Sequence, residues 1–307
     1  MTRYERQICL PEVGAQGQAR LSQVSVLVVG AGGLGSAVLP LLAGAGCGLI
    51  IVVDPDRVEA GNLHRQTLYR MADIDRPKAE CAARALRELN PECRVQAHVA
   101  RLDPVLAQHL MPQVDVVVDA ADSFAVTYAL SDVCLSADVP FISASVLGRS
   151  GYVGGFCGGA PSYRAVFPDL PIKAQTCATA GVMGPVVAML GTMQAQMTLS
   201  VLLDHDPSPL GQVITVDMAG WRVSSFRFDT AQEPEQAFPS VIAPSQITES
   251  DLVIDLRLAP APVRDELSLS TDQRVVLLCA TGLRAWRAAR KLGAEGHFAV
   301  AIVGDGE

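Results

Sequence analysis

The hydrophobic positions of this chain fall into short continuous runs, which is the pattern of strands buried on both faces of a sheet. These runs occupy residues 24–29, 49–53, 93–99, 114–119 and 140–145. Segments of helical length lie between them, at residues 36–45, 78–89 and 124–137. The alternation of strands and helices predicts an α/β fold with a Rossmann-like, mostly parallel sheet and helices on both faces.

The pattern is less regular elsewhere. Residues 10–19 are irregular and, with the polar N-terminus, indicate a surface arm. We expect β pieces at 152–153 and 163–167, an uncharged helix from 181, and antiparallel strands at 213–217 and 222–228. Strands at 252–255, 275–278 and 299–303 and a helix at 285–292 predict a second, very small α/β unit. The expected domains are residues 1–229 and 250–307, joined by a polar linker at 230–249.

The turn between the first strand and the first helix is rich in glycine. Gly30, Gly32, Gly33 and Gly35 form the motif, and Asp54 ends the second strand roughly 20 residues later. Glycine is needed where the chain turns sharply and lets backbone N–H groups approach a phosphate. The helix N-terminus adds partial positive charge, and a carboxylate at this spacing accepts hydrogen bonds from a ribose. Together these features predict a nucleotide site.

A polar loop follows Asp54 at the carboxyl edge of its strand, where open α/β sheets bind ligands. It carries Asn62, Arg65 and Gln66, which we expect at the phosphate end of the nucleotide. A nicotinamide-binding fold normally enters a helix at this point. The loop therefore favours a nucleotide with more phosphate charge.

Two further charged residues lie at the ends of elements. Lys78 is expected in the first turn of a helix, with Asp75 as its cap and Pro77 in its first turn. A lysine there opposes the helix dipole, which favours a functional role. Asp122 follows the strand at 114–119 and suits Mg²⁺, which prefers one or two carboxylates plus phosphate oxygens. The alternative for Asp122 is a helix N-cap without a metal.

Composition, net charge and cysteine content argue against several classes of function. Half of the 307 residues are apolar, and the net charge of −8 argues against a nucleic-acid surface. The eight cysteines, with no secretory signal after Met1, indicate reduced thiols in the cytoplasm. Residues 181–203 are uncharged and long enough to cross a bilayer. Pro185 and Gln194 within them, and the lack of flanking basic residues, favour a buried core or interface helix and no membrane.

The ordered set of motifs resembles the ThiF/MoeB/HesA family, the bacterial relatives of ubiquitin-activating E1 enzymes. The matching residues are Arg3-Tyr4-x-Arg6-Gln7, the glycine motif, Asp54, Asn62-Leu63-x-Arg65-Gln66, Pro77-Lys78, Asp122 and Cys177-x-x-Ala180-Gly181-Val182. The resemblance covers about residues 3–228. Residues 73–78 and 180–187 look closer to ThiF than to MoeB.

The resemblance implies an adenylyltransferase that uses ATP and Mg²⁺. Its substrate would be a ubiquitin-like sulfur carrier of the ThiS or MoaD type that ends in Gly-Gly, for thiamine biosynthesis. The implied roles are phosphate binding by the backbone of Gly32 to Gly35, ribose binding by Asp54, phosphate-charge stabilisation by Asn62, Arg65 and Lys78, and Mg²⁺ binding by Asp122. Gly30 and Gln66 are further residues expected to bind the nucleotide. An arginine matching Arg6 reaches the ATP of the partner subunit in this family, which implies a homodimer.

Sulfur chemistry adds further expectations. Cys177 matches the family cysteine that forms a covalent sulfur link to the carrier, with a small buried hydrophobe as an equal alternative. A cysteine desulfurase would be a further partner. The family usually carries two zinc-binding C-x-x-C pairs, but residues 162–165 read Ser-Tyr-Arg-Ala and the segment after Phe228 lacks a pair. We therefore expect no zinc, with the loop held by packing. Ser123 replaces the usual asparagine, which puts the local geometry in question.

The tail from about residue 250 looks like a shortened rhodanese domain. The stretch from Cys279 to Arg284 is similar to the rhodanese active loop, in which backbone N–H groups surround a cysteine persulfide. Such a ring of amides lowers the pKa of a thiol. The stretch from 257 to 274 is shorter than in the family and the final helix is missing. Active sulfur transfer by Cys279 and a docking module that has lost its activity both remain open.

Other function classes are also compatible with some of these residues. The same chemistry in molybdopterin biosynthesis, as in MoeB, is one alternative. A carrier-binding pseudoenzyme is another, suggested by the missing zinc ligands and the shortened tail. An NAD-dependent oxidoreductase agrees with the glycine motif and Asp54 alone, but Arg65, Lys78 and Asp122 suit a triphosphate with a metal.

Overall fold

The structure is a computed structural model that describes residues 3–170, 181–236, 238–258 and 273–304. Its main sheet has the strand order β3-β2-β1-β4-β5-β6-β7-β8. β1 to β5 are parallel, and β6 to β8 are antiparallel to their neighbours. The strands are β1 (Ser25–Val29), β2 (Leu49–Val53), β3 (Arg94–His98), β4 (Val116–Asp119), β5 (Phe141–Leu147), β6 (Ser150–Phe156), β7 (Gln212–Asp217) and β8 (Arg222–Arg227). The predicted mostly parallel, Rossmann-like sheet is confirmed.

Two layers of helices cover this sheet because successive strand residues point to opposite faces. On one face Val26 and Val28 pack with α3 (Gly33–Ala45), α4 (Lys78–Leu89) and α9 (Gly184–Leu202). On the other face Leu27 and Val29 pack with α5 (Pro104–Leu110) and α6 (Phe124–Ala137). The continuous apolar runs of the central strands therefore supply both cores.

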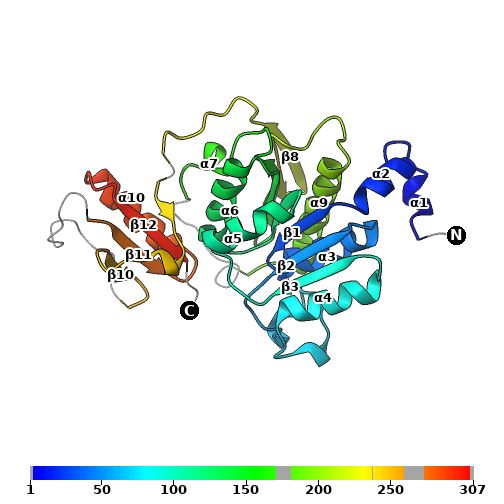
Figure 1. Cartoon of the computed structure of the whole chain (residues 1–307), viewed down its shortest axis with the longest axis horizontal. Coiled ribbons are helices and arrows are strands. Elements are labelled where there is room, and N and C mark those ends of the chain that lie inside the picture. Colours follow the sequence, from blue (N-terminus) through cyan, green and yellow to red (C-terminus); the bar gives the residue numbers. More distant parts are fainter. Residues whose placement is uncertain (1–2, 171–180, 237, 259–272, 305–307) are drawn as a thin grey trace.

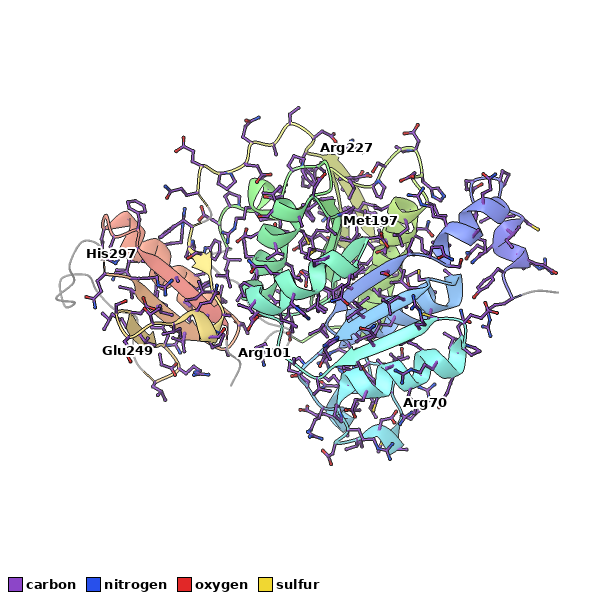
Figure 2. The ribbon with its side chains drawn as sticks, viewed as in Figure 1. Arg70, Arg101, Met197, Arg227, Glu249 and His297 are labelled. Atoms are coloured by element: carbon purple, nitrogen blue, oxygen red, sulfur yellow. The ribbon has the colours of Figure 1, made fainter. Side chains whose placement is uncertain are left out.

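The uncharged helix α9 is long and apolar enough to cross a membrane, and half of its most apolar window is buried inside the protein. It packs along α3 and against β5 and β6. Met197, labelled in Figure 2, is buried in this core. Gln194 Nε2 donates to the backbone oxygens of Asp119 and Ile142, at 2.6 and 3.0 Å. These are the contacts of a core helix.

Two local predictions are wrong. The segment at residues 10–19, expected to be irregular, contains most of α2 (Gly14–Leu21), and α1 (Glu5–Ile8) precedes it in the N-terminal arm. A Cβ on Gly17 would lie 3.0 Å from a methyl carbon of Leu203, so the glycine lets α2 approach the end of α9. Residues 163–167, expected as β structure, instead contain the helical turn α7 (Tyr163–Val166), because the Ser162 hydroxyl accepts the N–H of Ala165 and caps the turn.

The C-terminal part forms a second, four-stranded parallel sheet in the order β10-β11-β12-β9. Its elements are β9 (Ser240–Val241), β10 (Leu252–Asp255), β11 (Val275–Cys279), α10 (Leu283–Ala294) and β12 (Val300–Gly304). The stretch at 230–249, expected to be a linker, therefore contains a strand, because β9 lies within it and pairs with β12. Figure 1 shows this sheet at one end of the molecule and α1 at the other.

The strand order reverses direction between β1 and β4. From β1 the chain moves outward to β2 and β3, and then returns to add β4 on the other side. The loops after β1 and β4 consequently diverge and leave a crevice at the carboxyl edge, where open α/β sheets bind ligands. Gly30, Asp54 and Asp122 follow the ends of β1, β2 and β4 at this edge.

Candidate functional site: the nucleotide crevice

The glycine turn brings backbone segments closer together than any side chain would allow. Gly30 has φ +94°, and a Cβ on it would lie 2.6 Å from the carbonyl oxygen of Ala120. A Cβ on Gly35 would lie 2.2 Å from the oxygen of Gly30. Helix α3 begins at Gly33, earlier than the predicted start at residue 36, so its first N–H groups belong to the turn.

Asp54 ties the end of β2 to this turn. Its Oδ2 accepts the N–H of Ala31 at 2.7 Å, and its Oδ1 accepts the N–H of Asp56 at 2.8 Å. Burial raises the pKa of the Asp54 carboxyl, while the positive charge of Lys78 acts in the opposite direction. Each carboxylate oxygen keeps a lone pair for a ribose hydroxyl.

Lys78 is the first residue of α4, as predicted, and only 5 % of its surface is exposed. Its Nζ donates to Asp56 Oδ2 at 2.8 Å. The expected cap is wrong: Asp75 has φ +65°, and Pro77 is the N-cap residue. The sequence analysis did not single out Asp56. Its position shortly after the end of β2, in the polar loop expected to bind the nucleotide, could have identified it.

The loop after β2 places further polar groups beside the turn. Arg65 donates to Asn62 Oδ1 at 2.7 Å, and a Cβ on Gly33 would lie 3.6 Å from the Arg65 side chain. Gln66 Oε1 and Ser36 Oγ are buried and have no hydrogen-bond partner among the described residues. Ser36 belongs to the first turn of α3, and Gln66 Nε2 lies 3.7 Å from where a Cβ on Gly32 would be. Two unpartnered buried polar atoms near the glycine turn fit a polar ligand there.

Tyr69 is a second residue that the sequence did not reveal. Its hydroxyl donates to the oxygen of Ala31 at 2.6 Å, and it lies 3.4 Å from the oxygen of Lys78. This buried side chain holds the glycine turn against the start of α4. Tyr69 lies between Leu68 and Arg70, and a single tyrosine there carries no pattern that predicts such a contact.

Asp122 is exposed, and no hydrogen bond to another described residue engages its side chain. The N-cap residue of α6 is Ser123, so the alternative prediction that Asp122 caps this helix is wrong. The described ranges hold no group of three or more metal-ligating side chains. An Mg²⁺ ion at Asp122 would therefore take most of its ligands from phosphates and water, which is its usual preference.

A buried carboxyl supports the loop that carries Asp122. Asp119 ends β4 and accepts hydrogen bonds from Thr127 Oγ1 at 2.7 Å, Ser143 Oγ at 3.0 Å and the N–H of Ala121 at 3.2 Å. Burial raises the pKa of the Asp119 carboxyl from 3.8 to about 6. The folded protein therefore holds this proton more tightly than the unfolded chain does.

This shift predicts a pH-dependent difference between the protein and its Asp119→Asn variant. Between pH 4 and 6 the unfolded chain loses the Asp119 proton first, so the stability of the protein relative to the variant falls as the pH rises. A shift of about 2 pKa units corresponds to a change of about 3 kcal/mol. Urea unfolding of both proteins from pH 4 to 7 measures it, and parallel stability profiles would contradict it.

The structure does not bring every expected site residue to the crevice. Arg6 is exposed on α1, whose neighbour Gln7 donates to the oxygen of Ala45 at 3.1 Å. Ala45 ends α3, and the glycine turn lies at the other end of that 13-residue helix, about 20 Å away. Arg6 therefore does not reach the crevice of its own chain. Cys177 lies outside the described residues.

Cys279 lies at the end of β11 and is almost fully buried. Its Sγ accepts the N–H of Ala285 at 3.4 Å. The expected loop from Cys279 to Arg284 is shorter than predicted, because α10 already begins at Leu283 and Arg284 points to solvent from its first turn. The arginine is thus not part of a closed ring around the sulfur.

Hydrogen bonds, and not packing alone, hold the loop at which the family resemblance would place a zinc site. Glu233 accepts both the N–H and the hydroxyl of Ser162, each at 2.6 Å. Arg164 is buried and pairs with Asp132 at 2.6 Å. The Glu233 contact joins the two segments that the missing cysteine pairs would have linked.

Comparisons with known proteins show which sequences and folds this chain resembles. The model of the ThiF family matches residues 4–237. The sulfur carrier protein adenylyltransferase of Thermus thermophilus is 40 % identical over 225 residues, which cover 71 % of this chain and 83 % of that protein. The SAMP-activating enzyme E1 of Haloferax volcanii is 38 % identical over 219 residues, 71 % of this chain and 81 % of that protein.

Longer relatives match in the same region. The adenylyltransferase and sulfurtransferase MOCS3 of Drosophila ananassae is 39 % identical over 220 residues, 71 % of this chain and 49 % of that protein. The chain thus spans about half the length of such relatives. Among solved structures, E. coli MccB superposes with a TM-score of 0.66 at 24 % identity, covering 75 % of this chain and 73 % of MccB, which shows the shared fold.

Proposed function

The chain belongs to the ThiF family, and on that basis we propose that it uses ATP to adenylate the C-terminal glycine of a ubiquitin-like sulfur carrier. The observation that carries this proposal is the buried Lys78 ammonium, which lies beside Asp54 and Asp56 at the same sheet edge as the glycine turn. A buried cation next to exposed backbone N–H groups suits a polyphosphate. The relatives named as carrier-activating enzymes supply the substrate class.

The reaction needs positioning and charge stabilisation more than it needs a base. A carrier carboxylate oxygen attacks the α-phosphorus of ATP, the bond to the bridging oxygen breaks, and pyrophosphate leaves with the electron pair. The nucleophile is already an anion at neutral pH, so no proton has to be removed. Catalysis then depends on holding the reactants in line and on compensating the charge that develops.

The residues of the crevice divide these tasks. The N–H groups at the start of α3 face the phosphates, and Asp54 binds the ribose. Arg65, held by Asn62, and Lys78, held by Asp56, stabilise negative charge on the phosphates. An Mg²⁺ ion, which Asp122 would hold, neutralises phosphate charge when it is bound.

The proposal extends to assembly and pathway. Arg6 lies at the edge of the sheet opposite the crevice, so its contribution to an ATP site requires a second copy of the chain, as in a homodimer. The likeness of residues 73–78 and 180–187 to ThiF favours thiamine biosynthesis over molybdopterin biosynthesis. A cysteine desulfurase would supply the sulfur as a further partner.

Exchange of labelled pyrophosphate into ATP tests the adenylation step. With a carrier protein that ends in Gly-Gly we expect rapid exchange, and with the same carrier lacking its last glycine we expect none. Asp122→Asn should lower the exchange rate about 100-fold or more, because phosphate charge would be less well compensated. Tight carrier binding without exchange would instead favour a pseudoenzyme, and NADH oxidation without exchange would favour an oxidoreductase.

A further inference from the structure

The C-terminal unit contacts the loop that carries Asp122. The carbonyl oxygen of Thr281, in the loop after β11, accepts the N–H of Ala125 at 3.2 Å and the hydroxyl of Ser123 at 3.3 Å. Both donors belong to the start of α6, directly after Asp122. The first N–H groups of a helix have no partner within the helix, so the Thr281 carbonyl supplies one from another part of the chain.

Two glycines make this approach possible. A Cβ on Gly282, which has φ +83°, would lie 2.7 Å from the Cβ and 2.9 Å from the N of Ala125. A Cβ on Gly304, at the end of β12, would lie 2.6 Å from the same Cβ. The loop after β11 and the end of β12 therefore both pack closely against the first turn of α6, at positions where only glycine leaves enough room.

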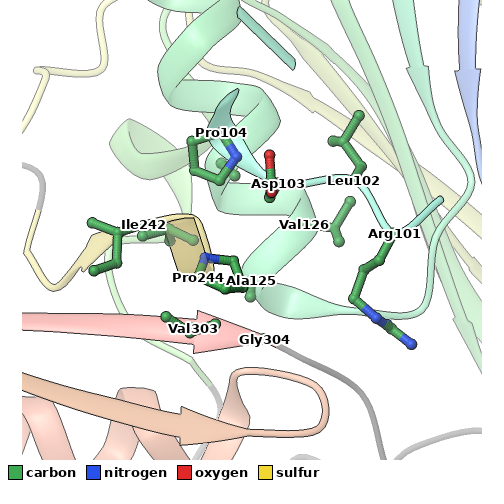
Figure 3. Close-up of a pocket in the computed structure, with 12 residues that line it drawn as sticks. Arg101, Leu102, Asp103, Pro104, Ala125, Val126, Ile242, Pro244, Val303 and Gly304 are labelled. Carbon is green, nitrogen blue, oxygen red and sulfur yellow. The ribbon is translucent and has the colours of Figure 1, made fainter. Parts of the chain in front are cut away.

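Aromatic and cationic side chains from α6, α7 and α10 also meet at this junction. The Trp286 ring of α10 lies 4.3 Å from the Tyr128 ring of α6, and the Arg164 guanidinium lies 4.7 and 5.3 Å from the Tyr128 and Trp286 rings. A cavity of about 60 Å³ lies at the junction between Arg101, Ala125 and Gly304 (Figure 3), with room for a water or two. One hydrophobic core includes residues of both units. The C-terminal unit is thus not a freely tethered module.

We propose that the C-terminal unit is a structural part of the nucleotide site, in which the Thr281 carbonyl holds the start of α6 and thereby positions Asp122. The inference rests on the proposed function, because positioning Asp122 matters only if its carboxylate acts in the reaction. The junction explains why serine stands at position 123 in place of the family asparagine. The Ser123 hydroxyl donates to the Thr281 carbonyl, and the side chain is buried next to Gly304. Thr281 and Ser123 are positioning residues and touch no substrate.

The test uses Gly282→Ala in the full chain, with Gly296→Ala as the matched control. Both glycines have nearly the same φ, +83° and +85°, but Gly296 lies beyond the other end of α10. In Gly282→Ala the added methyl group would clash with Ala125, so the loop after β11 must move away from the start of α6. We expect amide hydrogen exchange in residues 122–127 to become about tenfold faster than in the control. The Mg²⁺ concentration for half-maximal pyrophosphate exchange should rise about threefold or more.

Ser123→Ala is a milder second variant in case Gly282→Ala does not fold. It removes one hydrogen bond and adds no atoms, and Ser136→Ala at the other end of α6 is its control. We expect faster amide exchange in residues 122–127 for Ser123→Ala alone. Unchanged exchange in both junction variants would overturn the positioning role, whether or not the chain adenylates a carrier. Faster exchange without pyrophosphate exchange by the parent protein would leave the junction supported and contradict the proposed function instead.

Discussion

Replacing Lys78 by methionine should lower the rate of carrier-dependent pyrophosphate exchange by about 100-fold or more. The Lys78 ammonium is the buried positive charge of the crevice, and it contacts Asp56 at 2.8 Å beside Asp54. Methionine keeps the packing of the buried side chain but removes the charge that would meet the phosphates. We expect the maximal rate to fall more than the affinity for ATP, because the charge to be stabilised grows as pyrophosphate leaves.

Lys291→Met is the matched control, since Lys291 is exposed in the last turn of α10. It should exchange pyrophosphate at the parental rate. Mixing Lys78→Met with Arg6→Ala chains tests the proposed dimer, because a mixed dimer regains one complete site. Random pairing would then restore about a quarter of the parental rate. A Lys78→Met protein that retains its rate would contradict the assignment of the crevice.

The Gly35→Ala variant should lose about 3 kcal/mol of unfolding free energy and most of its ATP affinity. The new Cβ would lie 2.2 Å from the oxygen of Gly30, so helix and turn must move apart. That movement displaces the backbone N–H groups proposed to hold the phosphates. Urea unfolding measures the first effect and calorimetric titration with ATP measures the second.

Gly44→Ala in the same helix is the control for this substitution. A Cβ on Gly44 has no neighbour within 4 Å, and alanine is the better helix former. Gly44→Ala should therefore raise the stability by about 0.5–1 kcal/mol and leave ATP binding unchanged. Equal stability losses in the two variants would show that helix propensity, and not the contact with Gly30, decides the effect.

Much of the fold could be predicted because local pattern and burial agree. The strands β1, β2 and β4 are apolar on both faces, and only a sheet covered by helices on both sides buries such runs. The glycine turn was equally clear, because Gly30 and Gly35 meet steric demands that no other residue satisfies. The arm at α2 was missed because Gly14 and Gly17 have poor helix propensity, and contact with α9 overrides it.

The sequence by itself thus determined the alternation of strands and helices, the turn at Gly30 and the acidic and basic residues that follow the strand ends, because these depend on neighbours along the chain. Only the tertiary structure decided three contacts: Asp56 pairs with Lys78, Glu233 accepts a hydrogen bond from Ser162, and the Thr281 carbonyl accepts the N–H of Ala125. The last two contacts join residues far apart in sequence, and the first depends on where α4 docks. No local pattern encodes such partners, since they follow from how the packed elements are placed in space.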